Sequence, residues 1–335
     1  MILKVNIMNK IYGNRLILSA MRNMIKNNHT ANSVIIFGEK GSGKKLIADY
    51  YANMLLCEKP DEGNPCGLCP SCRNFLAGSH PDVTYPETSG KLEGYSVDTI
   101  RNIINDAFIK PNNNTGRKIY IFRDCRNMDS RPQNMLLKLI EEPPEYAFFI
   151  FTAESKYEFL PTILSRCICF STSPCQEDEV FSALSEKGFS ENEINSAVNC
   201  FHGNIGMCID FIKDDNLRKQ VDLTKRISDS IIRKDEYALN AALYSIGSDR
   251  KNIFSVLSMF DKLMRDCAVF NKDKSAPDIG CCRESAVTLS GNVTAYQAEK
   301  IHRCIENARN AIRFSINASV AMSALCAEIT DIIRS

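Results

Sequence analysis

The first half of the chain alternates short apolar runs with segments of helical periodicity. Runs of four or five apolar or β-branched residues, separated by polar and glycine-containing stretches, are typical of strands buried in a sheet. Because helical patterns lie between these runs, the sequence predicts an α/β fold with a parallel sheet covered by helices on both faces. Five strands are expected, at residues 33–37, 82–85, 118–122, 147–151 and 167–170.

One of the intervening helices has a pattern clear enough to predict its packing. Residues 96–109 have the sequence SVDTIRNIINDAFI, in which Ser96 is a suitable N-terminal cap. The apolar residues recur at helical spacing and form one stripe, which we expect to pack on the sheet: Ile100, Ile103, Ile104, Ala107 and Phe108.

The pattern changes after STSP at residues 171–174. No further strand signal follows, and the remaining sequence is helical in pattern, so a domain boundary is expected near residue 172. The charged stretch RKDE at 233–236 separates two helical parts. The sequence therefore predicts an α/β domain at 1–172, a small helical domain at 173–235 and a second helical domain at 236–335.

Composition narrows the class of protein. The chain has 335 residues, of which 44% are hydrophobic, which is enough for real cores, and its net charge of +1 gives no overall positive field for a stand-alone DNA binder. The N-terminus lacks the apolar run of a signal peptide, and no stretch reaches the roughly 18 apolar residues of a membrane span. We therefore expect a soluble, cytoplasmic protein with no membrane partner, whose nucleic-acid contacts are local or shared with other proteins.

Residues 38–45, GEKGSGKK, lie between the first predicted strand and a helical pattern. This is the context of a phosphate-binding loop. Gly38, Gly41 and Gly43 allow backbone N–H groups to converge on phosphate oxygens, and Lys44 is expected to contact the β and γ phosphates. The expected ligand is ATP or ADP, and the alternative is a vestigial anion site.

Two positions depart from the pattern of a hydrolytic site. Lys45 stands where a serine or threonine would coordinate Mg²⁺, and Arg123 stands where the metal-binding aspartate after the third strand belongs. Lysine cannot bind Mg²⁺, so we expect little or no ATP hydrolysis in this chain's own site. Asp124 is the nearest acid, and a role in the loop or as a cap explains it at least as well as catalysis.

Four of the 15 cysteines are regularly spaced. Cys57, Cys66, Cys69 and Cys72 lie in CEKPDEGNPCGLCPSC, which contains two C-x-x-C steps. Four thiolates held this way fit a closed, tetrahedral Zn²⁺ site of the structural type, and a disulfide or plain thiols are the alternatives. The other 11 cysteines (15 minus 4) show no ligand spacing and are expected to be core or surface thiols.

Several motifs together resemble one known family. The phosphate loop, the four-cysteine insertion, HPDV at 80–83, QNMLLKLIEEPPE at 133–145 and LSRC at 164–167 are similar to motifs of the clamp-loader subunits of bacterial DNA polymerase III, which are AAA+ proteins. The resemblance is specific over about the first 172 residues. It implies an AAA+ module with an inserted zinc module at 57–72, a small helical lid, and a helical collar that closes a five-subunit ring.

The resemblance also implies roles for individual residues. Arg166 would be an arginine finger that reaches ATP held by a neighbouring motor subunit, and Thr152 aligns with the position that senses the γ-phosphate. Gly206 stands at about the position where active members carry an arginine in the lid. Together with Lys45 and Arg123, it makes three positions at which a group needed for hydrolysis in cis is replaced.

The resemblance therefore favours a non-motor, or stator, subunit. It implies gamma/tau motor subunits and a delta subunit as partners, and the sliding clamp and primer-template DNA as what the complex acts on. The alternative is an active motor subunit, which predicts serine or threonine at position 45 and aspartate at position 123. A zinc-dependent nucleic-acid-binding module is a second rival, but residues 57–72 contain Lys59 as their one basic residue and no aromatic residue.

Overall fold

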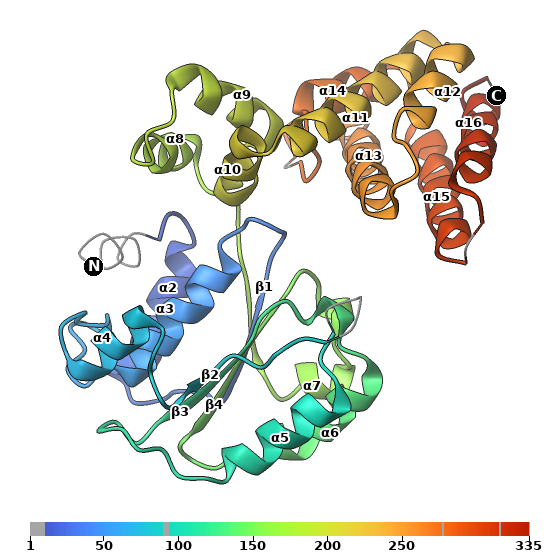
Figure 1. Ribbon diagram of the computed structural model, residues 1–335. Helices are drawn as coiled ribbons and strands as arrows, with labels where there is room; N and C mark the ends of the chain where they lie inside the picture. Colours follow the sequence, from blue (N-terminus) through green and yellow to red (C-terminus); the bar gives the residue numbers. More distant parts are fainter. Residues whose placement is uncertain (1–10, 90–93, 277, 315, 335) are drawn as a thin grey trace. The chain divides into compact units, whose positions relative to one another are not determined.

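The computed structural model describes residues 11–89, 94–276, 278–314 and 316–334. These residues form two compact units. The first extends to Ala183 and includes Asn204–Gly206, and the second comprises Leu184–Gly203 and the residues from Met207 onward. Figure 1 shows that the first unit contains the sheet and that the second is built of helices.

A five-stranded parallel sheet is the framework of the first unit. Its strands are β1 (Ser33–Phe37), β2 (Val83–Thr84), β3 (Lys118–Phe122), β4 (Ala147–Ala153) and β5 (Ile168–Ser171), in the spatial order β2-β3-β4-β1-β5. In the middle of the sheet, Ile35 lies opposite Phe151 and Cys169. The expected α/β class and all five strands are confirmed, although β2 is shorter than predicted and β4 continues to Ala153.

Alternate residues of the strands face two different layers of helices. Phe37, Phe122 and Phe151 lie in one core, which is completed by α5 (Val97–Ala107), α6 (Ser130–Glu141) and α7 (Pro161–Leu164). Val34, Ile36 and their neighbours lie in the other, which is completed by α2 (Arg15–Lys26) and α3 (Lys44–Leu56). Figure 1 shows these helices on the two faces of the sheet. Strands β1, β3 and β4 are buried along their whole length, which explains why they are apolar throughout rather than alternating.

Helix α5 follows its predicted pattern except at its end. The Ser96 hydroxyl accepts a hydrogen bond from the Thr99 N–H at 3.0 Å, which confirms the cap. Ile100, Ile103 and Ala107 are buried in the core beneath the helix. The prediction for Phe108 is wrong, because the helix ends at Ala107 and the Phe108 side chain is 64% exposed.

The carboxyl ends of the strands carry the segments that matter for the site. The loop at 38–43 follows β1, a single-turn helix η1 (Cys125–Asn127) follows β3, and another, η2 (Lys156–Glu158), follows β4. Since the strands are parallel, these segments meet at one edge of the sheet, where ligands bind in open α/β folds. The unit is completed by α4 (Pro70–Ala77) and by the first part of α8 (Glu177–Ser185).

The second unit is helical. After α9 (Glu191–Phe201) and α10 (Ile205–Lys213), which begins at the division between the units, a bundle shares one large core. Its helices are α11 (Asp215–Arg233), α12 (Glu236–Tyr244), α13 (Arg250–Phe270), α14 (Arg283–Ser290), α15 (Ala295–Arg313) and α16 (Ala318–Arg334). The mostly helical second half expected from the sequence is thus confirmed.

The three-domain division remains a proposal. Ile227 and Ile231 of α11 belong to the same core as residues of α12 to α16, so α11 packs with the helices that follow position 235. None of the helices in the described ranges combines the length and the apolar character needed to cross a membrane.

Candidate functional site

The phosphate loop has the backbone that its glycines predict. Gly41 and Gly43 have φ of +84° and +82°, a left-handed conformation that glycine adopts at little cost. Helix α3 begins at Lys44, so its first N–H groups point toward the loop. This arrangement favours anions, because the exposed N–H groups and the helix dipole both place partial positive charge there.

Lys44 lies inside this loop. Its side chain is buried, and Nζ donates to the carbonyl oxygen of Glu39 at 3.0 Å. Burial lowers the pKa of Lys44, and the carboxylates of Glu154 and Asp124 partly oppose that shift. A phosphate bound in the loop would place a negative charge next to this buried ammonium group and would favour its charged form.

Asn204–Gly206 belong to the first unit through contacts with the loop. The Gly206 N–H donates to the carbonyl oxygen of Gly41 at 3.1 Å, and the Asn204 side chain donates to that of Lys40 at 2.8 Å. A Cβ atom at position 206 would lie 2.5 Å from the Gly41 Cα. The contact therefore requires glycine at the position where the resemblance expects an arginine in active members.

The two departures from the hydrolytic pattern face the same pocket. A pocket of about 460 Å³ is lined by Lys45 from the start of α3 and by Arg123 and Asp124 from the end of β3. Tyr85, Tyr95 and Arg126 are also among its lining residues. The structure thus brings together the two positions at which an active site would hold Mg²⁺, and both carry cations.

Arg123 is fixed in this pocket by Asp49, a residue that the sequence analysis did not identify. Its Nη2 donates to both carboxylate oxygens of Asp49, at 2.7 and 2.5 Å, and its guanidinium lies over the Tyr85 ring, 4.3 Å from the centroid. The Tyr85 hydroxyl donates to the same carboxylate at 3.2 Å. Although burial opposes its charge, the pairing with Asp49 raises the pKa of Arg123. Asp49 follows Lys45 by one helical turn, so both side chains lie on the same face of α3.

Asp124 is committed to contacts within the protein. Its Oδ2 accepts from Arg126 at 2.7 Å, and Arg126 also pairs with Glu154 at 3.4 Å. Its backbone has φ of +60°, and its N–H donates to the Thr152 hydroxyl at 2.9 Å. Thr152 is fully buried in β4. The sequence analysis left a loop role and a catalytic role open for Asp124, and these contacts favour the loop role.

Arg166 belongs to the same unit and lies just after α7. Its Nε pairs with Glu141 Oε1 at 2.7 Å, and its Nη1 donates to the Thr162 carbonyl at 2.8 Å and to the Ser165 hydroxyl at 3.1 Å. The side chain keeps 37% of its surface exposed. Among the described residues, Nη2 of Arg166 has no hydrogen-bond partner, so one edge of the guanidinium is available to another molecule.

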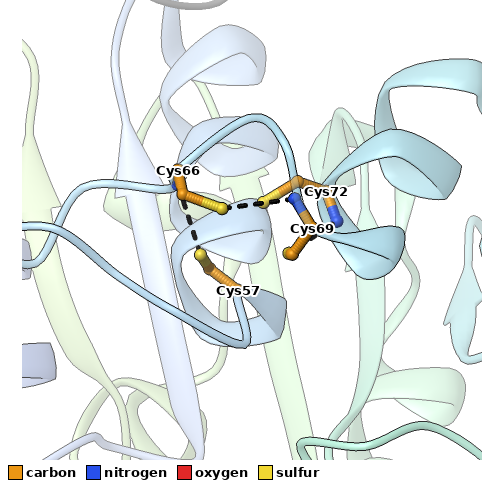
Figure 2. A group of neighbouring side chains, drawn as sticks. All are labelled: Cys57, Cys66, Cys69 and Cys72. Carbon is orange, nitrogen blue, oxygen red and sulfur yellow. Dashed lines mark hydrogen bonds between the residues drawn. The ribbon is translucent and has the colours of Figure 1, made fainter.

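The four cysteines meet at one point (Figure 2). The Sγ atoms of Cys57, Cys66, Cys69 and Cys72 all lie within 4.8 Å of one another. Zn–S bonds of about 2.3 Å place the sulfurs of a tetrahedral site about 3.8 Å apart, so a small adjustment would bring this set onto a metal. An all-thiolate donor set suits Zn²⁺, and the cluster can hold such a metal ion.

Backbone N–H groups support the cysteine cluster. The N–H groups of Cys66, Cys69 and Cys72 donate to the Sγ atoms of Cys57, Cys66 and Cys69, at 3.2, 3.4 and 3.4 Å. Burial raises the pKa of Cys57 and Cys72. Burial acts on Cys66 in the same direction, but the N–H donors of Leu68 and Cys69 outweigh it and lower the pKa of this thiol to about 7. A bound cation would hold all four groups as thiolates.

Neighbouring side chains attach this cysteine module to the sheet. Glu58 accepts hydrogen bonds from the Ser71 N–H and hydroxyl and from the Asn114 side chain, at 3.0 to 3.2 Å. The buried carboxylate of Asp82, in the HPDV motif, accepts from the backbone N–H of Asn112 and the side chain of Asn113. The motif therefore has a structural role, because it fixes the loop that enters β3.

Comparison with known proteins supports the clamp-loader resemblance. Residues 13–176 match the family model described as DNA polymerase III, delta subunit. The chain is 30% identical over 138 residues to DNA polymerase III subunit delta' of Pseudomonas aeruginosa, covering 41% of this chain and 42% of that protein. It is 28% identical over 217 residues to subunit delta' of Escherichia coli, covering 63% and 64%. Each alignment spans less than two thirds of the relative.

A tau/gamma subunit is similar to this chain as well. Subunit tau/gamma of Haemophilus influenzae is 28% identical over 183 residues, which cover 54% of this chain and 26% of that protein. Among solved structures, a DNA polymerase III gamma subunit-related protein from Thermotoga maritima aligns with 94% of this chain and 99% of its own, at 16% identity and a TM-score of 0.42. The family match and the delta' relatives support the resemblance: residues 13–176 are similar to the delta-prime subunits of DNA polymerase III.

Proposed function

We propose that the chain is the non-motor, delta-prime stator of a DNA polymerase III clamp loader. In this role it donates Arg166 to the ATP site of a neighbouring gamma/tau subunit and hydrolyses little or no ATP itself. The observation that carries the proposal is the pocket in which Lys45 and Arg123 stand together. Mg²⁺ needs oxygen ligands and is repelled by the two cations, so the chemistry of a motor site is disfavoured here.

The surroundings of Arg166 support the other half of the proposal. An arginine finger needs a planar, permanently charged group. Some of its N–H donors must be free of hydrogen bonds within the protein so that they can bind the neighbour's phosphate. Arg166 is oriented by Glu141 and Thr162, and its side chain remains 37% exposed. The sliding clamp, primer-template DNA, the delta subunit and a five-subunit ring enter this proposal through the family resemblance.

The phosphate loop and the cysteine cluster complete the proposal. The loop keeps its left-handed glycines and Lys44, which is consistent with ATP or ADP binding without turnover. The four cysteines would hold a structural Zn²⁺ in the module that follows α3. Thr152 remains a candidate sensor position, although in this structure its hydroxyl accepts from the Asp124 N–H.

An active motor subunit is the second candidate. The similarity to tau/gamma of Haemophilus influenzae and the intact Lys44 favour it. It is less consistent with the pocket, because position 45 offers no hydroxyl and position 123 offers no carboxylate.

The test is steady-state ATPase of the reconstituted clamp loader, with clamp and primed DNA present. The wild-type chain is compared with Arg166→Ala and with Arg131→Ala, which removes an exposed arginine from α6 of the same unit. We expect Arg166→Ala to assemble normally and to lower the rate, with a loss of about 10³-fold at the one interface affected. Arg131→Ala should retain the full rate. Normal hydrolysis by the Arg166→Ala complex would contradict the stator role, and rapid ATP turnover by the isolated wild-type chain would favour the motor.

A further inference from the structure

The pocket beside the phosphate loop holds a charge that none of the described residues neutralises. Lys45 lines it from the first turn of α3, and within the described ranges its ammonium group has no ion pair or hydrogen bond. Arg123 forms an ion pair with Asp49, and Arg126 forms ion pairs with Asp124 and Glu154. The pocket therefore presents one unpaired cation next to two that are already held in place.

This arrangement sets which ligand the pocket can accept. A divalent cation entering with a nucleotide would meet Lys45 directly. Of the two carboxylates that line the pocket, Asp124 is paired with Arg126, and Glu87 is exposed to solvent. An anion meets the opposite conditions, because α3 begins at Lys44, next to the phosphate loop, and Lys45 of its first turn lines the pocket. The volume of about 460 Å³ lies within the range of ligand sites, which is about 300–1,000 Å³.

We propose that the phosphate loop and this pocket together bind a nucleoside di- or triphosphate free of divalent metal, with Lys45 at the place of the ion. Mg²⁺ then weakens binding, because it neutralises the phosphate oxygens that Lys44 and Lys45 would otherwise contact. In a motor site, where the metal is itself a bridge between protein and phosphate, Mg²⁺ strengthens binding. The inference extends the proposed function by giving the form of the nucleotide, and it does not involve Arg166.

The test is isothermal titration calorimetry of the full chain with ATP and with ADP, in EDTA and in excess MgCl₂. The wild-type chain is expected to bind at least about threefold more tightly in EDTA. Lys45→Ala should weaken binding in EDTA by about tenfold, the loss of roughly one charge-assisted contact. Lys110→Ala, which removes an exposed lysine from a loop outside the pocket, should bind as the wild type does.

A second variant exchanges the chemistry of the pocket. Lys45→Thr combined with Arg123→Asp restores an oxygen at both positions, and we expect it to bind ATP more tightly with Mg²⁺ than in EDTA. Circular dichroism and thermal unfolding show whether each variant is folded. If the double variant does not fold, the titrations of the wild-type chain and of Lys45→Ala test the inference without it.

Three results would overturn the inference: equal or tighter binding of the wild-type chain with Mg²⁺, no binding of ATP or ADP in either buffer, or unchanged affinity in Lys45→Ala. None of them bears on Arg166. The Arg166→Ala chain should bind nucleotide as the wild type does, so failure here leaves the stator role intact, and failure of the ATPase experiment leaves this inference intact.

Discussion

Arg123 and Arg166 lie in the same unit and are almost equally exposed, with 41% and 37% of their side-chain surfaces accessible. Their partners differ far more. Asp49, which holds Arg123, is only 14% exposed, whereas Glu141, which holds Arg166, is 42% exposed. Arg123 also lies against Tyr85. Within the described ranges, the buried Nε of Arg123 and the Nη2 of Arg166 each lack a hydrogen-bond partner.

The comparison shows that exposure of an arginine alone does not reveal its role. A charge whose partner is buried is costly to separate, so the Arg123–Asp49 pair is a fixed part of the pocket wall. A charge whose partner is solvated can exchange it for a phosphate at little cost. Arg123 is therefore part of the pocket wall, whereas Arg166 can exchange its partner, as the proposed finger role requires.

The largest effect on stability is expected at the proposed zinc site, which lies at the end of the helix that carries the partner of Arg123. Helix α3 carries Lys45 and Asp49, and it ends at Leu56, with Cys57 as its C-terminal cap. We expect Cys69→Ser to release about one Zn²⁺ per chain and to lower the free energy of unfolding by about 4 kcal/mol or more, since a closed metal site contributes directly to folding. Metal analysis and urea unfolding measure both.

Cys169→Ser, in the exposed β5 of the same unit, is the matched control and should change neither quantity appreciably. If the wild-type chain stripped of metal unfolds at the same urea concentration as the untreated chain, a structural metal at these four cysteines is ruled out.

The next largest effect is expected on the ATPase rate. It tests whether Arg166 acts through the two parallel donors of its guanidinium group or only through its positive charge. Arg166→Lys keeps the positive charge but loses the planar pair of donors that matches phosphate oxygens. We expect it to lose most of the rate that Arg166→Ala loses at that interface, which is about 10³-fold for a typical finger. The measurement is ATPase of the assembled loader at matched complex concentration. Substantial activity in Arg166→Lys would mean that charge alone suffices.

The sequence predicted the framework well because its signals are local. Continuous apolar runs identified all five strands, and the spacing of the four cysteines identified a cluster that the structure brings together. The errors lie at the ends of elements, because tertiary packing decides at which residue a helix or strand stops. Phe108 continues the apolar stripe of α5 in sequence, but the helix stops one residue earlier and leaves it exposed.

The partners of the two arginines could not be predicted in the same way. Asp49 lies 74 residues from Arg123, and an aspartate in a helix is ordinarily a solvated surface charge. One signal was present, since Asp49 follows Lys45 by a helical turn and must share its face. Tyr85 and Glu141 carried no comparable signal, because their contacts depend on how β2, β3 and α6 are placed in the folded unit.

A smaller effect on the free energy of unfolding tests the ion pair between Arg123 and Asp49. Arg123→Ala leaves the largely buried Asp49 without its cation, and we expect the free energy of unfolding to fall by about 1–3 kcal/mol. Arg166→Ala should cost less than about 1 kcal/mol, because Glu141 is solvated. Urea unfolding of both variants measures the difference. Combining Arg123→Ala with Asp49→Ala should recover part of the loss, and simple additivity of the two would show that the pair is not coupled.

The smallest effect concerns Glu141, which orients Arg166 through Nε. Glu141→Gln keeps a hydrogen-bond acceptor and removes its charge, so we expect loader ATPase to fall by about two- to fivefold, the difference between a charged and a neutral hydrogen bond. Glu141→Ala removes the acceptor altogether and should lower the rate further. Stability should stay within about 1 kcal/mol of the wild type in both, because the pair is exposed. A graded loss of rate without loss of stability would establish Glu141 as a positioning residue, whereas unchanged rates in both variants would mean that Thr162 and Ser165 orient Arg166 without it.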